Sequence, residues 1–417
     1  MKKMLFHFIL PVLFILPVFS LSAYDWGILL DQSGGIENVN YLGGKTSSVS
    51  DGINYSGTLI PWFSTPFGGA GKFFLSAGFT MEYANEELTF LPQLFRTDFS
   101  RTMENGGELR AGRMQYADPL GFVANGLFDG AQYSFDIGKM GTLGIGIFYT
   151  GLLDKKNANI TMTGEDLQSY YTAIDYSDFT DTYFASRRLM AAVDWNYPDI
   201  TDWLRLKVAL IGQFDVNGRE ESYHSQYLMA RGTIPWNQFV FDLRFCMEAA
   251  EMKKEYADQI FRLGFAGELG IGWRLPTAMR SQLSFTGRFS SGTTDEDGIF
   301  TAFVPITTET QGDVLMAKLS GLSMLRLDYT ARPSDAVSFN LAASYFILSD
   351  LGTYNGFPTQ KDGHFLGSEF SGLLVWAPYS DLRITLGGGV FLPSLGNADN
   401  ISDPLWSINL NAILVIF

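Results

Sequence analysis

Long stretches of this sequence alternate between apolar and polar residues at every second position, and this alternation limits the folds open to the chain. Around residue 243, for example, Phe241, Leu243 and Phe245 are apolar, whereas Asp242 and Arg244 lie between them. A period of two is that of a β-strand with one apolar face. Apolar residues at helical spacing over a comparable length are absent from the sequence. The alternation therefore predicts an all-β protein.

About eighteen segments show this alternation, and sixteen is the alternative count. The expected strands are 24–33, 52–63, 71–83, 88–98, 107–115, 129–139, 141–151, 182–197, 201–216, 222–232, 236–250, 256–273, 277–291, 320–331, 334–349, 365–378, 380–392 and 405–417.

The connections between these segments alternate in length. Tight links such as 198–200 and 378–380 contain Pro, whereas the links 152–181 and 292–319 are long. Short turns at one end and long loops at the other are typical of a bacterial outer-membrane barrel. The expected fold is therefore an antiparallel transmembrane β-barrel with short periplasmic turns and long extracellular loops.

The tryptophans support this arrangement. Seven of the eight lie near the expected short-turn ends of their strands: Trp26, Trp62, Trp195, Trp203, Trp236, Trp273 and Trp376. Indole rings favour the membrane–water interface, so this clustering predicts a periplasmic girdle.

The N-terminus has the features of a secretory signal. Lys2 and Lys3 precede an apolar stretch over 4–19, and small residues follow at Ser22 and Ala23. This order of charge, apolar stretch and small residues predicts a signal peptide over 1–23 and a barrel over 24–417, located in the bacterial outer membrane. The alternative is an uncleaved anchor helix.

Composition argues against several classes of protein. A net charge of −15 disfavours nucleic acid as a partner, since phosphate binding needs an excess of Lys and Arg. The chain has one Cys and three His, and it lacks His-Glu-x-x-His and Gly-x-Ser-x-Gly motifs. We therefore expect no enzyme activity, no metal site and no cofactor.

The polar face of the strands is expected to line the barrel. Charged residues on a lipid-facing surface are costly, so charges should sort inward. The predicted pore-lining residues on this face are Arg110, Arg205, Lys207, Arg244, Arg262, Arg280, Arg288, Arg326, Arg383, Glu268 and Asp242. Guanidinium groups suit carboxylates and phosphates, which favours anionic solutes, but an internal network of ion pairs that fills the barrel is the alternative.

Two stretches, 107–131 and 366–393, resemble the alginate-export porin family. The first contains Gly112-Arg113-Met114 followed by Asp129-Gly130, and the second contains Gly367-Ser368-Glu369 with a Phe391-Leu392-Pro393 ending. The resemblance implies an eighteen-stranded barrel that passes an anionic polysaccharide through an Arg-rich lumen.

By matching position, the resemblance also implies roles for individual residues. Arg110 and Arg113 would be pore residues, and 116–128 would form a loop that folds inward. Asp118, Asn125 and Asp129 would then narrow the pore.

The sequence therefore predicts a porin for passive or selective diffusion of small or anionic solutes. Its expected partners are those solutes, outer-membrane lipid, and the barrel-assembly machinery, which would recognise the apolar last strand ending at Phe417. Oligomeric state is left open. Two alternatives are a closed barrel whose acidic loops bind ligands or surfaces, and a hydrophobic-substrate channel of the fatty-acid transporter kind.

Overall fold

The fold was analysed in a computed structural model of the chain. The structure describes residues 24–38, 52–84, 87–201, 203–219, 221–253, 259–292, 300–307, 310–349, 363–397 and 403–417. The expected signal peptide, 1–23, lies outside these residues.

Eighteen antiparallel strands form one sheet, which confirms the predicted fold class and the higher of the two strand counts. The strands of this sheet are β1 (Asp25–Glu37), β2 (Gly52–Phe67), β3 (Gly71–Ala84), β4 (Glu87–Thr102), β5 (Glu108–Ala117), β6 (Asn125–Asp136), β7 (Thr142–Tyr149), β8 (Arg188–Thr201), β9 (Leu204–Asp215), β10 (Ser222–Trp236), β11 (Phe239–Lys253), β12 (Ile260–Arg274), β13 (Gln282–Ser290), β16 (Leu322–Ala331), β17 (Val337–Leu348), β18 (Phe365–Trp376), β19 (Leu382–Leu392) and β20 (Leu405–Ile416).

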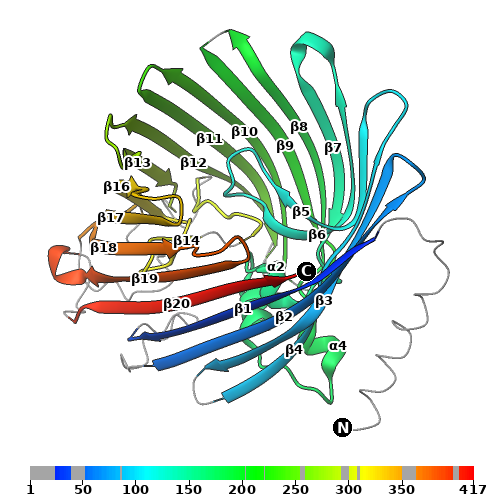
Figure 1. The fold of residues 1–417 in the computed structure, drawn as a ribbon, viewed down its shortest axis with the longest axis horizontal. Coiled ribbons are helices and arrows are strands. Elements are labelled where there is room, and N and C mark those ends of the chain that lie inside the picture. The colour runs from blue at the N-terminus through cyan, green and yellow to red at the C-terminus, as the bar shows by residue number, and fades with distance from the viewer. Residues whose placement is uncertain are drawn as a thin grey trace.

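The sheet closes on itself because the first and last strands pair. β1 runs antiparallel to β20, with Ile28 opposite Ile416 and Glu37 opposite Ser407. The two strands lie side by side in Figure 1, as the blue and red ends of the colour scale. Closure removes the unpaired edges that an open sheet would expose.

The two faces of the wall differ as the period-two pattern predicts. Residues directly opposite one another in a strand pair point to the same face. On β20 the outward residues Ile408 and Leu410 are exposed, whereas the inward Asn411 donates a hydrogen bond to Asp31 of β1. Trp62 differs from the predicted girdle, because it is opposite Gly27 on the face of Asp31 and therefore faces the lumen.

The described parts of two long connections, those after β7 and after β13, pack inside the barrel. The segment between β7 and β8 forms three short helices, α2 (Lys155–Ala158), α3 (Gly164–Tyr171) and α4 (Phe179–Tyr183). The segment between β13 and β16 contains a small hairpin of β14 (Thr310–Gln311) and β15 (Ala317–Lys318). Two short 3-10 turns, Gly138–Met140 and Pro393–Leu395, complete the elements.

These inward segments bury a core inside the barrel. Leu153 and Ile160 from one connection and Phe303 and Ile306 from the other join a cluster that includes inward residues of the wall, such as Met229. The lumen is therefore partly filled on the side of β5–β12.

Among the described residues, no helix has the length and apolar character needed to cross a membrane.

Candidate functional site

A short loop between β5 and β6 folds around one carboxylate. Asp118 Oδ1 accepts the backbone N–H groups of Leu120 and Gly121, at 2.7 and 2.9 Å. Its Oδ2 accepts those of Val123 and Ala124, both at 2.8 Å. Burial raises the pKa of the Asp118 carboxyl above its ordinary value, while the four N–H groups act in the opposite direction. Asp118 thus shapes the loop with its carboxylate turned into the loop backbone.

This loop, residues 118–124, is called the inner loop below, and it reaches arginines on other strands. Arg244 Nη1 of β11 donates to the Leu120 carbonyl at 2.9 Å, and Arg231 Nη1 of β10 donates to the Pro119 carbonyl at 3.4 Å. The Arg288 guanidinium of β13 lies 5.7 Å from the centre of the Phe122 ring. The inner loop therefore connects the β5–β6 side of the lumen to the wall at β10–β13.

A second segment supports the inner loop. The N–H groups of Ile306 and Thr307 both donate to the Val123 carbonyl, at 2.8 and 3.1 Å. Thr307 Oγ1 accepts the N–H of Asn125 at 2.9 Å. Two connections that are far apart in the sequence thus form one hydrogen-bonded unit inside the barrel.

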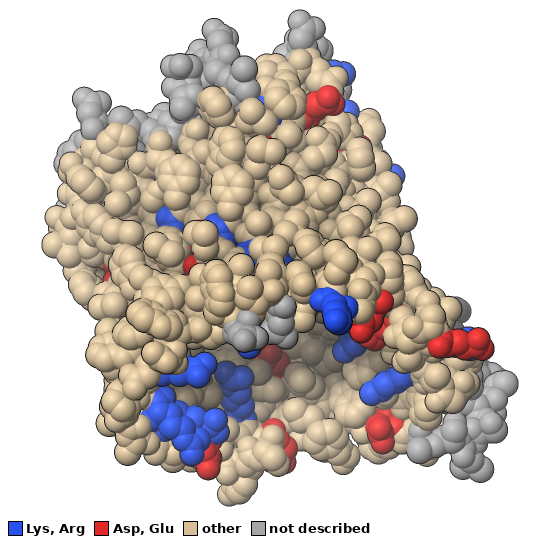
Figure 2. Space-filling view, turned by 90° about the horizontal axis from the view of Figure 1, so that it is seen from above, with Lys and Arg blue, Asp and Glu red and all other residues tan. Residues whose placement is uncertain are grey.

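The part of the wall that the inner loop contacts carries a row of mostly basic side chains. Successive strands β9 to β13 place five charged residues directly opposite one another, namely Lys207, Arg231, Arg244, Glu268 and Arg288. This set is called the basic row below. Because strands of a barrel tilt against its axis, a row that crosses them changes depth along the lumen. Figure 2 shows an opening into the molecule with Lys and Arg side chains on both sides of it.

Acidic partners fix the arginines of the basic row without matching their charge. Arg231 and Arg244 both bind Asp242, at 2.6 and 2.7 Å. Arg288 binds Glu268 at 2.6 Å, and Arg244 also lies 3.3 Å from Glu268. With Asp194 of β8, which interacts electrostatically with Lys207, four bases and three acids leave this part of the wall with one net positive charge. The side chains of all three arginines are partly accessible.

The hairpin segment between β13 and β16 is hydrogen-bonded to a second buried carboxylate, which belongs to the wall. Glu369 of β18 accepts the N–H groups of Asp313, Val314 and Leu315, at 2.7 to 3.0 Å. Asp313 in turn binds Arg326 of β16 at 3.0 Å, and Arg326 also binds Asp328 at 3.0 Å. Arg326, Asp313 and Asp328 together therefore carry one net negative charge.

The residues of β5 and β6 that the sequence singled out do not form one group. Arg110 binds Asp98 of β4 at 2.7 Å on the lumen face. Arg113 lies three positions along β5, on the opposite face, where its side chain is buried and binds Asp129 at 2.8 Å. Asn125 bonds with the Gln115 side chain at 3.3 Å on that same face. The structure thus brings Arg113 and Asp129 together as an ion pair apart from the lumen face of β5.

The remaining predicted pore residues divide between the lumen face and the short-turn end. Arg205 is opposite Thr233, Arg262 is buried on the face of Glu268, and Arg383 is opposite Ile413 on the inward face of β20. Arg280 lies in the turn between β12 and β13.

Sequence reasoning missed Arg231, which is central to the basic row. Its strand has no clean apolar face, because Tyr227 and Met229 point inward to the buried core while Leu228 points outward. Arg231 is directly opposite Lys207 and Arg244, and this would have identified it. The register of paired strands, however, cannot be read from the sequence of one strand.

The described ranges hold no cluster of three or more His, Cys, Asp or Glu side chains arranged to bind a metal ion. Cys246 is buried and forms no disulfide bond.

No family model matches the chain, and no curated protein is significantly similar to it in sequence. Solved structures share the fold along nearly the whole chain. A BenF-like porin from Pseudomonas fluorescens Pf-5 has a TM-score of 0.62 at 10% identity, covering 95% of this chain and 99% of that one. Pseudomonas aeruginosa OccK2 (OpdF), solved in complex with glucuronate, has a TM-score of 0.61 at 12% identity, covering 94% and 96%.

The outer-membrane protein OprD from Pseudomonas aeruginosa is a further example, with a TM-score of 0.57 at 14% identity, covering 94% of this chain and 93% of that one. The chain therefore has the fold of outer-membrane porins.

Proposed function

We propose that the protein is an outer-membrane channel for selective diffusion of small anionic solutes. The observation that supports this most strongly is the basic row, whose partly accessible arginine side chains lie where the inner loop meets the wall. Guanidinium groups bind carboxylates through paired, charge-assisted hydrogen bonds. A row that changes depth along the lumen offers successive positions for one anionic group.

The fold and the similar porin structures support a channel rather than an enzyme. One of those porins was solved with glucuronate, a carboxylate. The outward band of exposed apolar side chains, which includes Ile147, Leu243 and Leu410, suits contact with outer-membrane lipid. The narrower assignment to the alginate-export family, and a polysaccharide as the solute, stay hypotheses.

The first test is the ion selectivity of the barrel formed by residues 24–417. In a planar bilayer with a KCl gradient, we expect a reversal potential of the sign that marks Cl⁻ as the more permeant ion. Lys139→Gln removes a basic residue from the β6–β7 turn and serves as a control that should leave the potential unchanged. Conductance that favours K⁺ in the wild type would reject the anion channel.

A barrel that is correctly folded but does not conduct would favour the alternative of a closed barrel with binding loops. The inward packing of the long connections is the observation on which that alternative rests. Asp175, Asp178 and Asp181, which lie on the connection between β7 and β8, would then be the residues to test for ligand binding.

The C-terminal residue provides a separate test of membrane assembly. Phe417 is 81% exposed and contacts Trp62 edge-on at 6.1 Å between ring centres. We expect deletion of Phe417 to reduce the amount of folded barrel in the outer membrane severalfold, because assembly machinery would lose its terminal aromatic. Refolding of the purified chain in detergent should be nearly unaffected, and heat-modifiable gel mobility reports both quantities. Equal losses in cells and in detergent would contradict a role in recognition.

A further inference from the structure

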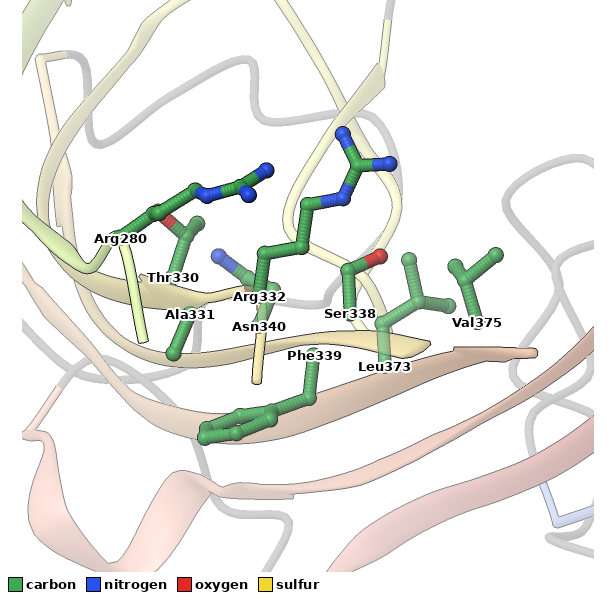
Figure 3. A pocket seen from close by; sticks show the side chains of 9 residues that line it. All are labelled: Arg280, Thr330, Ala331, Arg332, Ser338, Phe339, Asn340, Leu373 and Val375. Carbon is green, nitrogen blue, oxygen red and sulfur yellow. The ribbon is translucent and has the colours of Figure 1, made fainter. Parts of the chain in front are cut away.

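A cavity at the short-turn end of the barrel lies apart from the inner loop. It has a volume of about 210 Å³ and is open to one side. Its walls come from the turns after β12 and β16 and from the inward faces of β16, β17 and β18. Figure 3 shows the Arg280 and Arg332 side chains reaching over it, with Thr330, Ser338 and Asn340 below them. We call this cavity the mouth pocket.

The two arginines of the mouth pocket are held close together by the backbone. The Arg332 N–H donates to the Met279 carbonyl at 2.7 Å, which fastens one turn to the other. Arg280 has a φ of 49°, a left-handed conformation that non-glycine residues seldom adopt. The turn therefore fixes the position of the Arg280 backbone beside Arg332.

A carboxylate of the protein already lies between these guanidinium groups. Asp335 Oδ1 is 3.1 Å from Arg280 Nη1 and 3.7 Å from Arg332 Nη2. The side chain of Asp335 is 81% exposed, and those of the arginines are 68% and 51% exposed. Ion pairs this exposed stabilise a protein little, so an external carboxylate could replace Asp335 at small cost. The pair also keeps one surplus positive charge while Asp335 is bound.

The mouth pocket lies on the same inward face of β16 as Arg326, which is opposite Thr286 of β13, two positions from Arg288 of the basic row. The Asn340 side-chain amide donates to Asp328 Oδ1 at 3.3 Å, and Asp328 is bound by Arg326. Thr330 lies four residues beyond Arg326 on the same face of β16, a step of roughly 13 Å along a strand. A solute that moves from Arg288 of the basic row past the β16 strand toward the short turns would next meet the arginines of the mouth pocket.

We propose that the mouth pocket is a second binding site for carboxylate solutes, at the short-turn exit of the channel, and that Asp335 competes with the solute for it. The Arg280 and Arg332 guanidinium groups bind the carboxylate, and Leu373 and Val375 contact an apolar part of the solute. Displacement of the bound solute by Asp335 then returns the site to its resting state. This inference rests on the proposed function of an anion channel.

The experiment measures block of single channels by benzoate, with benzamide as a neutral probe of the same shape. Benzoate is added to each side in turn. We expect block from the short-turn side in the wild type, and a dwell time about threefold longer in Asp335→Asn, which removes the competing charge. In the double variant Arg280→Gln/Arg332→Gln, dwell times should fall roughly tenfold or more, because charge-assisted hydrogen bonds are lost. Lys139→Gln, on another short turn, is the matched control.

The outcomes separate this proposal from the function on which it rests. A wild-type channel that is not anion-selective rejects the proposed function. An anion-selective channel whose benzoate dwell times are the same in the wild type and the double variant rejects the mouth pocket alone. Shorter dwell times in Asp335→Asn would show that Asp335 positions the arginines, and would overturn its role as a competitor. Equal block by benzamide would show that charge is not recognised.

Discussion

Replacing Asp118 with Ala is expected to raise the single-channel conductance severalfold and to weaken ion selectivity. The substitution leaves the four N–H groups of the inner loop without their acceptor inside the barrel. Each buried, unsatisfied N–H costs about 1–3 kcal/mol, which is enough in sum to release a loop of seven residues. The wall strands do not depend on Asp118, so the barrel itself should still fold.

Asp118→Asn provides the graded comparison. The amide keeps one acceptor oxygen, so about half of the loop contacts remain and conductance should lie between those of the wild type and Asp118→Ala. Single-channel recording in a planar bilayer, with folded protein selected by heat-modifiable mobility, measures both variants. Unchanged conductance in Asp118→Ala would mean that the inner loop does not narrow the channel.

The triple variant Arg231→Gln/Arg244→Gln/Arg288→Gln is expected to reverse the ion selectivity. It removes three positive charges and leaves Asp242 and Glu268 without their guanidinium partners. Charges about 4 Å from a passing ion contribute about 1–4 kcal/mol each in a partly hydrated environment, so the permeability ratio should change by about tenfold or more. Reversal potentials in a KCl gradient give the ratio.

Arg113→Gln is the informative comparison for the triple variant. It also removes one guanidinium group, but from the face of β5 opposite Arg110. Its main expected effect is lower stability, because Asp129 loses a partner in a poorly accessible place. Selectivity should change little. If Arg113→Gln altered selectivity as much as the triple variant, charge in the basic row would not be the source of the preference.

The barrel wall could be predicted from the sequence because one physical requirement acts on every strand. One face meets an apolar environment and the other does not, so the period of two recurs along the whole chain. The same rule also separates Arg110 from Arg113, since residues three apart on a strand point to opposite faces. The family resemblance grouped them together, and the alternation at β5 is the better guide.

The interior was predictable only in part, for a different physical reason. An inward loop over 116–128 was expected, but its contacts with Arg244, Phe303 and Ile306 depend on strands and loops far away in the chain. The hairpin of β14 and β15 could not be predicted from its own residues. The backbone between its strands is held by Glu369 of β18, which is distant in the sequence. Contacts between distant segments have no periodicity for a sequence analysis to detect.

Ile306 and Thr307 both donate hydrogen bonds to Val123, and these bonds limit how the solute specificity of such a channel can be altered. Neither segment is an independent module, since each supplies the backbone partners of the other. A chimera that exchanges only one of them with another barrel would place a foreign loop against unmatched carbonyl and N–H groups. Specificity should therefore be transferable only when both segments are exchanged together, and substitutions in one should be compensated in the other.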